Sequence, residues 1–249
     1  MKRTPLVAGN WKMNGGQSLV ASMATALAEY QGVADVVVCP PFPYLASARE
    51  QLPAAIGLGA QNVSDQAEGA FTGEVAASML AEAGCGYVII GHSERRALYA
   101  ESDAQIADKF AQVQAAGLIP VLCVGEPLAE READNTEAVV CGQLQAVIDA
   151  VGIAAFAKAV VAYEPVWAIG TGKTATPEQA NSMHLVIRNQ LVELATEQFV
   201  TKMRILYGGS VNADNAEELL GQSEIDGALV GSASLKTDQF PGIITAAKG

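Results

Sequence analysis

Short runs of apolar residues recur along the whole chain, and they lack the polar alternation that is typical of a half-exposed strand. The runs are rich in Val, Ile, Leu and Ala, which suits parallel strands buried on both faces. The pattern predicts strands at Leu6–Asn10, Val36–Cys39, Gly57–Ala60, Tyr87–Ile90, Ile119–Val124, Val160–Tyr163, Ile205–Tyr207 and Ala228–Val230.

Helix-start signals lie between these runs. Residues 102–105 (Ser-Asp-Ala-Gln) form a capping-box pattern, and residues 176–179 (Thr-Pro-Glu-Gln) add a proline at the first helical position. Val211 and Asn212 are expected to open a further helix. His184 falls inside the helix that Thr-Pro-Glu-Gln begins, where we expect a structural role. Eight strands in 249 residues leave about 31 residues per unit, the size of one βα repeat.

This alternation indicates an α/β fold, either a closed (β/α)8 barrel or a doubly wound open sheet. The polar residues favour the barrel. Asn10 and Lys12 lie at the end of the first strand, His92 after the fourth and Glu164 after the sixth. A barrel gathers all carboxyl ends on one rim, whereas an open sheet spreads them along an edge. Because no charge-rich or Ser/Gly-rich linker divides the chain, we expect one catalytic domain over residues 1–249.

Charge and composition exclude several classes of protein. The formal net charge of -12 would repel a nucleic-acid backbone or an anionic lipid surface, so we expect neither partner. No run reaches the roughly 20 apolar residues of a membrane helix, and the N-terminus is too polar for a signal peptide. The four cysteines show no C-x-x-C and no metal-ligand spacing with the two histidines, which indicates a reduced, cytoplasmic location.

The residues at the strand ends are candidates for catalysis. Asn10 and Lys12, two positions apart, could point at the same ligand, or could belong to a solvated surface turn. His92 lies where a strand turns into a helix, and the free N–H groups of Ser93 and Glu94 would favour a neutral imidazole that donates a hydrogen bond to a carbonyl oxygen. The alternative is a structural histidine whose ring nitrogens form hydrogen bonds with backbone groups.

Glu164 follows an apolar strand that Pro165 ends. Apolar walls would destabilise the charge of this carboxylate and make it a better general base, although a surface glutamate capping a loop is the alternative. The neighbouring Trp167 and the glycines after it favour a functional role.

Residues 166–174 superficially suggest two nucleotide-binding motifs. A P-loop requires glycine where this chain has Trp167, so that motif fails. Gly170-x-Gly172-x-x-Ala175 matches the relaxed dinucleotide fingerprint, but it lies six residues after Glu164 rather than directly on the turn. An apolar tip followed by glycines is more typical of a lid over an active site.

Glycine-rich turns follow the last two predicted strands, at residues 207–210 (Tyr-Gly-Gly-Ser) and 230–234 (Val-Gly-Ser-Ala-Ser). Backbone N–H groups at such turns bind phosphate without positive side chains, and the loops after strands seven and eight are the usual phosphate site of a barrel. An anionic small molecule is therefore compatible with the acidic chain.

Together, five segments resemble triosephosphate isomerase: residues 8–14, 91–95, 162–179, 207–211 and 230–235. They span the whole chain in the family's order and spacing. The resemblance implies a single-domain TIM barrel that interconverts dihydroxyacetone phosphate and D-glyceraldehyde 3-phosphate through an enediolate, in glycolysis and gluconeogenesis, without cofactor or metal.

The resemblance also implies roles for individual residues. Glu164 would be the base, His92 the neutral electrophile, and Lys12 and Asn10 would stabilise the enediolate and position the substrate, with Glu94 in support. Phosphate would bind to backbone N–H groups of Gly170, Ser210, Gly231 and Ser232. Residues 165–173 would form the lid that shields the enediolate from water.

Two further features bear on the resemblance. The family has a Gly-Gly pair where this chain has Gly231-Ser232, and we expect Ser232 to adopt an ordinary φ on the first turn of a helix. Residues 61–74 resemble the family's dimer loop, so we expect Thr72 to insert into a partner subunit of a homodimer near Asn10 and Lys12. Another phosphosugar isomerase or lyase, or a barrel kept only for binding or as a scaffold, remains an alternative.

Overall fold

A computed structural model describes residues 3–30, 32, 34–169, 174–195 and 202–247. Its described part contains parallel strands that pair in chain order and close on themselves, since β1 pairs with both β2 and β8. The strands are β1 (Leu6–Asn10), β2 (Asp35–Cys39), β3 (Ile56–Ala60), β4 (Tyr87–Ile90), β5 (Ile119–Val124), β6 (Val160–Tyr163), β7 (Arg204–Tyr207) and β8 (Gly227–Val230). The predicted barrel is confirmed, and each predicted strand lies within one residue of the observed bounds.

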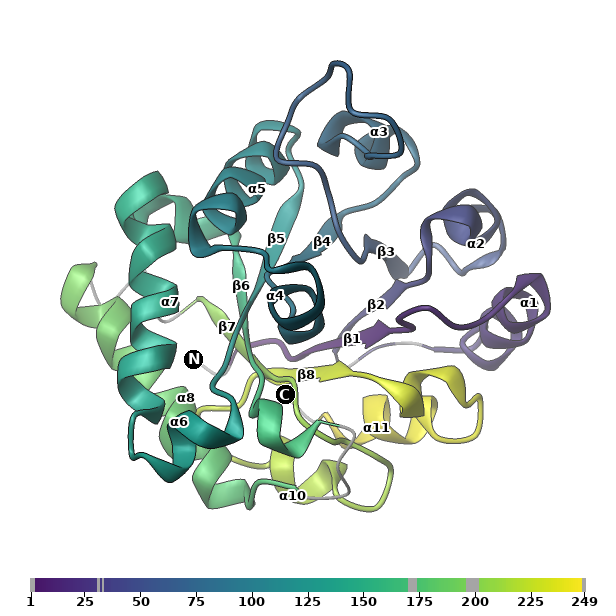
Figure 1. Ribbon diagram of the computed structural model, residues 1–249. Helices are drawn as coiled ribbons and strands as arrows, with labels where there is room; N and C mark the ends of the chain where they lie inside the picture. Colours follow the sequence, from purple (N-terminus) through teal and green to yellow (C-terminus); the bar gives the residue numbers. More distant parts are fainter. Residues whose placement is uncertain (1–2, 31, 33, 170–173, 196–201, 248–249) are drawn as a thin grey trace.

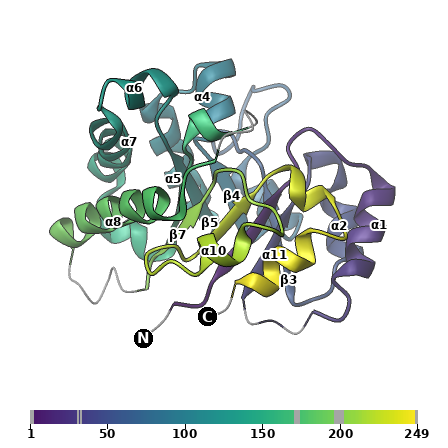
Figure 2. The same cartoon turned by 90° about the horizontal axis from the view of Figure 1, so that it is seen from below.

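Helices surround the barrel and connect its strands (Figure 1). The α-helices are α1 (Gln17–Ala26), α2 (Leu45–Gln51), α3 (Ala77–Glu82), α4 (Ser93–Tyr99), α5 (Asp103–Ala115), α6 (Leu128–Glu132), α7 (Thr136–Val151), α8 (Pro177–Leu194), α10 (Ala216–Leu220) and α11 (Phe240–Ala246). The 3-10 helices are η1 (Phe42–Tyr44), η2 (Ile153–Lys158), η3 (Val166–Ala168) and η4 (Ser232–Leu235). Figure 2 shows α4 and α6, which follow β4 and β5, at the same end of the barrel.

The strands lack polar alternation because both of their faces are buried. Inside the barrel, alternate residues such as Leu6 and Ala8 of β1 form one apolar cluster with Val37 and Cys39 of β2. The residues between them, Val7 for example, pack outward against the helices in a second and larger cluster. Each strand thus contributes to two cores, which is why its sequence is apolar throughout.

The two predicted capping boxes are present. Ser102 caps α5, and Thr176 caps α8 with Pro177 at its first position. The helix predicted to open at Val211–Asn212 instead begins at Ala216. There the Asn212 side chain accepts hydrogen bonds from the N–H groups of Asp214 (2.9 Å) and Asn215 (3.1 Å), so a turn precedes α10.

Candidate active site

A cavity of about 220 Å³ opens at the carboxyl ends of the barrel strands. It brings together seven of the sequence-predicted site residues, which come from five different strand ends: Asn10, Lys12, His92, Glu164, Ser210, Gly231 and Ser232. Ile169 of the predicted lid and Gly208 and Gly209 of the predicted phosphate turn also line it. The remaining lining residues, for which we expected no role in the site, are Trp11, Asn14, Val211, Leu229 and Leu235. Residues up to 225 positions apart in the sequence, Asn10 and Leu235, meet here only because the barrel closes.

Asn10 and Lys12 share this cavity, but not through strand alternation. β1 ends at Asn10, and Lys12 adopts a left-handed backbone with φ 52. The Asn10 Oδ1 atom accepts a hydrogen bond from the Lys12 backbone N–H at 3.0 Å, which stabilises this unusual turn. The Lys12 ammonium forms an ion pair with the carboxylate of Glu94 on α4. Glu94 therefore holds the lysine at the mouth of the cavity.

His92 occupies the N-cap position of α4, as its place between strand and helix suggested. Its Nδ1 atom accepts the backbone N–H of Glu94 at 3.2 Å, which requires a lone pair on Nδ1, and we therefore assign the ring proton to Nε2. The Nε2 atom lies 2.9 Å from Glu164 Oε1. Burial lowers the pKa of His92, but the charge and hydrogen bond of Glu164, together with the charge of Glu94, outweigh burial and raise the pKa above its ordinary value.

Glu164 lies one residue beyond β6 and is 1% exposed. Burial raises the pKa of this carboxyl group, but the His92 contact, the backbone N–H of Ser93 at 2.8 Å and the Lys12 charge lower it below its ordinary value. The expectation that apolar walls would dominate is therefore wrong for this arrangement. Polar partners from two other strand ends compensate the buried charge.

Two glycines flank the backbone of Glu164, Gly125 after β5 and Gly208 after β7. A Cβ atom on Gly125 would lie 1.8 Å from the Glu164 carbonyl oxygen, and one on Gly208 would lie 2.9 Å from Glu164 Cγ. The Glu164 N–H donates to the Val124 carbonyl at 2.8 Å, and the Gly208 N–H donates to the Tyr163 carbonyl at 2.7 Å. Only glycine allows both neighbours to approach this closely.

The opposite end of the cavity is formed by the turns after β7 and β8. Ser232 is the first residue of η4 and has no positive φ, so the expectation of an ordinary backbone conformation is confirmed. The Ser234 hydroxyl donates to the Gly231 carbonyl at 2.7 Å and closes this turn. A Cβ atom on Gly231 would lie 3.7 Å from Lys12 Cε, so the lysine stem runs beside the turn.

The segment predicted as a lid, residues 165–173, is described up to Ile169. Residues 170–173, and with them the candidate phosphate ligand Gly170, lie outside the described residues. The indole N–H of Trp167 donates to Glu126 Oε1 at 2.8 Å, and the Tyr163 hydroxyl lies 3.1 Å from Glu126 Oε2. Glu126, fully buried on the loop after β5, thus connects the end of β6 to the start of this segment.

Sequence reasoning missed two polar groups of this region. The Ser93 N–H contacts Glu164 through the backbone, which leaves no signature in residue type. Glu126 follows the apolar run of β5, just as Glu164 follows that of β6, and this repeated pattern was a signal for it. His184, expected to be structural, is buried with Nδ1 3.3 Å from the Glu224 carbonyl, and burial lowers its pKa to about 3.

Comparison with known proteins identifies the family of the chain. A family model described as triosephosphate isomerase matches residues 5–247. The chain is 65% identical over 248 residues to the triosephosphate isomerase of Alcanivorax borkumensis, covering 100% of both chains. It is 58% identical over 245 residues to that of Halorhodospira halophila, covering 98% of each. The chain belongs to the triosephosphate isomerase family.

Triosephosphate isomerases interconvert dihydroxyacetone phosphate and D-glyceraldehyde 3-phosphate, and this is the reaction of the chain. Family membership removes the alternatives of a different phosphosugar enzyme and of a scaffold barrel. In the described part of the chain, no helix combines the length and apolarity needed to cross a membrane. The described residues also contain no group of three or more His, Cys, Asp or Glu side chains arranged to hold a metal ion.

Proposed function

We propose that Glu164 is the base that moves a proton between the two carbons of the triose, and that His92 polarises the carbonyl oxygen. One observation carries this proposal: a buried carboxylate lies 2.9 Å from an imidazole Nε2 on the wall of the same cavity. A base and a hydrogen-bond donor at this spacing can act on a carbon and its neighbouring carbonyl.

The reaction follows from these positions. Glu164 takes a proton from the carbon next to the carbonyl, while the Nε2–H of His92 donates to the carbonyl oxygen. The ammonium of Lys12 and the amide of Asn10 stabilise the negative charge of the enediolate and hold the substrate. A proton then passes between the two enediolate oxygens by way of His92 Nε2, so that the former carbonyl oxygen gains a proton and the former hydroxyl oxygen loses one. Glu164 returns its own proton to the neighbouring carbon, which gives the isomer.

Substrate binding also activates the base. In the arrangement described above, Glu164 occupies the Nε2–H of His92 that the carbonyl oxygen needs. Once the substrate takes this donor, Glu164 loses a group that lowers its pKa but keeps its burial, which raises it. The carboxylate of Glu164 therefore becomes a stronger base when the substrate, whose proton it accepts, is bound.

We assign the phosphate of the substrate to the turns after β7 and β8. Backbone N–H groups of Ser210, Gly231 and Ser232 would bind it, with Gly170 contributing from residues 165–173. These groups are neutral, so they bind an anion in spite of the chain's net charge of -12. Residues 165–173 would cover the bound triose and keep water from the enediolate.

Replacing Glu164 with Gln tests the assignment of the base. An amide of the same shape cannot accept the proton, so kcat in a coupled assay with D-glyceraldehyde 3-phosphate should fall by at least about 10²-fold. Binding of a phosphate-bearing enediolate mimic, measured by calorimetry, should change by less than about tenfold because the phosphate turns are intact. A Glu164→Gln variant with near-wild-type kcat would refute the assignment.

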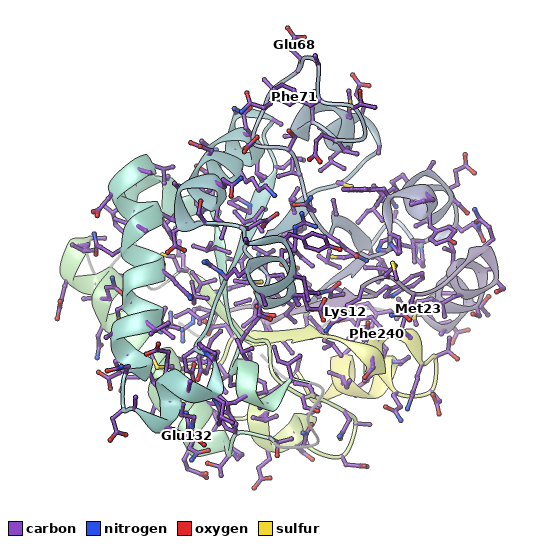
Figure 3. All side chains as sticks on the ribbon, viewed as in Figure 1. Lys12, Met23, Glu68, Phe71, Glu132 and Phe240 are labelled. Atoms are coloured by element: carbon purple, nitrogen blue, oxygen red, sulfur yellow. The ribbon has the colours of Figure 1, made fainter. Side chains whose placement is uncertain are left out.

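We also propose a homodimer built by the loop between β3 and α3. Figure 3 labels Phe71 and Glu68 at the outer end of this loop, away from Lys12 of the same chain. Phe71 is 47% exposed. A second cavity of about 440 Å³ beside the active site is lined by the exposed side chains of Met13, Leu98 and Tyr99. In a two-fold symmetric dimer, the loop of each subunit would insert into this cavity of its partner, so one chain supplies both surfaces of the contact.

Replacing Thr72 with Arg tests the dimer. The larger, charged side chain should overpack the contact and give monomers with low activity. Sedimentation velocity together with kcat at the same concentration checks this, and a fully active monomer would contradict it.

We further propose that the whole chain acts as one catalytic domain in the cytoplasm, in glycolysis and gluconeogenesis. The free thiols of its four cysteines suit a reducing compartment.

A further inference from the structure

The β4–β5 ladder ends earlier than the β5–β6 ladder. The carbonyls of Val124 and Glu126 accept hydrogen bonds from the N–H groups of Glu164 (2.8 Å) and Val166 (3.2 Å). Because peptide groups alternate in direction along an extended strand, the N–H and C=O of Gly125 point the other way, toward β4. The chain after β4 does not continue beside them, since it turns at Gly91 with φ 67 and enters α4.

Two side chains bond the backbone groups that lose their strand partner where β4 ends. The Gly125 N–H donates to Gln143 Oε1 at 2.8 Å, and Gln143 Nε2 donates to the Gly125 carbonyl at 3.2 Å. Arg96 Nε donates to the Gly91 carbonyl at 2.8 Å. A side-chain amide has the same donor and acceptor as a peptide group, so Gln143 of α7 takes the place of a neighbouring strand.

Gly125 also packs closely against the backbone of Glu164. A Cβ atom at this position would lie 1.8 Å from the Glu164 carbonyl oxygen and 3.1 Å from Glu164 Cβ. Gly208 contacts the other side of the same residue, with its own N–H bound to the Tyr163 carbonyl at 2.7 Å. A displacement of Gly125 therefore moves the backbone that holds Glu164.

We propose that Gln143 is a positioning residue for the base: its amide fixes Gly125, and Gly125 fixes Glu164. This inference rests on the proposed role of Glu164. Without the amide, Gly125 at the end of β5 loses both hydrogen bonds to Gln143, and the carboxylate of Glu164 moves out of line with the substrate. A misplacement of a reacting group by about 1 Å costs about 10²-fold in rate.

The first test replaces Gln143 with Met, which has a similar length but makes neither hydrogen bond. We expect kcat to fall by about 10- to 100-fold while KM stays within about threefold, because the phosphate turns lie on other strands. Gln145→Met is the matched control. Gln145 lies on the same helix and makes two hydrogen bonds, from Gln190 and to Asp149, and neither of these bonds involves a strand.

The second test is the pH profile of Gln143→Glu. A protonated carboxyl group can accept from the Gly125 N–H and donate to its carbonyl, as the amide does, whereas the ionised form can only accept and repels that carbonyl. The ratio of the kcat of this variant to that of the wild type should therefore decrease from pH 5 to pH 8, by at least about fivefold. A residue that only stabilises the fold would not produce this pH dependence.

The outcomes separate this inference from the proposed function. A Gln143→Met variant with kcat within twofold of wild type, a loss shared equally by Gln145→Met, or a pH-independent ratio for Gln143→Glu overturns the inference. If Gln143→Met does not fold, the pH profile of Gln143→Glu decides alone. Glu164→Gln is measured in the same assay. If Glu164→Gln keeps the wild-type kcat, the proposed base is refuted. If Glu164→Gln loses activity while Gln143→Met keeps the wild-type kcat, only the role of Gln143 is refuted.

Discussion

Gly208 provides a direct test of how closely the barrel holds the carboxylate that we propose as the base, Glu164. A Cβ atom at this position would lie 2.9 Å from Glu164 Cγ and 3.1 Å from the Tyr163 carbonyl oxygen. That carbonyl accepts the N–H of Gly208 itself at 2.7 Å, so the two backbones cannot separate without losing a hydrogen bond. In Gly208→Ala the side chain of Glu164 must therefore move.

The distance sets the size of the effect. Non-bonded carbon atoms approach to about 3.5–4.0 Å, so Glu164 Cγ has to shift by about 0.6–1.1 Å. A shift of about 1 Å at a reacting group costs about 10²-fold, and we expect kcat to fall by about 10- to 100-fold. Overpacking of this kind also lowers the free energy of unfolding by about 1–3 kcal/mol.

The assay compares Gly208→Ala with Gly142→Ala. Gly142 is exposed on α7 and has open space where a Cβ atom would be added. Alanine is favoured over glycine in a helix by about 1 kcal/mol, so this control should be more stable than wild type with unchanged kcat. Steady-state kinetics and urea unfolding measure both quantities. If Gly208→Ala keeps kcat within twofold of wild type, the reasoning that the flanking glycines position Glu164 is refuted.

Two further predictions concern Ser232 and His184. Ser232→Gly should change the affinity for a phosphate analogue by less than about tenfold because the backbone N–H remains, whereas Ser232→Pro, which lacks that N–H, should weaken it far more; calorimetry distinguishes the two. The pKa of His184 is about 3 in the fold against 6.5 ordinarily, so the unfolded chain binds the proton first and stability is lost as pH falls below 6.5. Urea unfolding should show wild type losing about 2 kcal/mol more than His184→Gln between pH 7 and pH 5, and equal losses would contradict this.

Much of the fold follows from patterns that are local in the sequence. A strand buried on both faces must be apolar throughout, so the eight strands are visible as apolar runs such as Ile119–Val124. Helix starts at Ser102 and Thr176 depend on hydrogen bonds within one turn, and both are found where residue type predicts them. Asn212 shows the limit of such signals, because its side chain caps a turn and delays the helix to Ala216.

The chemistry of the site was determined less completely by residue type. Sequence could name Glu164 because a carboxylate at the end of an apolar strand is unusual, but it gave the wrong direction for the pKa. The partners that lower this pKa, His92 and the Ser93 N–H, are brought to Glu164 only by barrel closure. Electrostatic effects act through space and decay with distance, so their sign depends on tertiary neighbours.

The same reason explains the supporting contacts. Gln143 is an ordinary polar residue of a helix, and nothing near it in sequence connects it to Glu164. It reaches Gly125 because β4 turns away and leaves a peptide group without a strand partner. Apolar patterns and caps are local, and they determined the strands and several helix starts. The burial, charge balance and hydrogen-bond partners of Glu164 were decided by the tertiary structure. They depend on residues that only the closed barrel brings into contact.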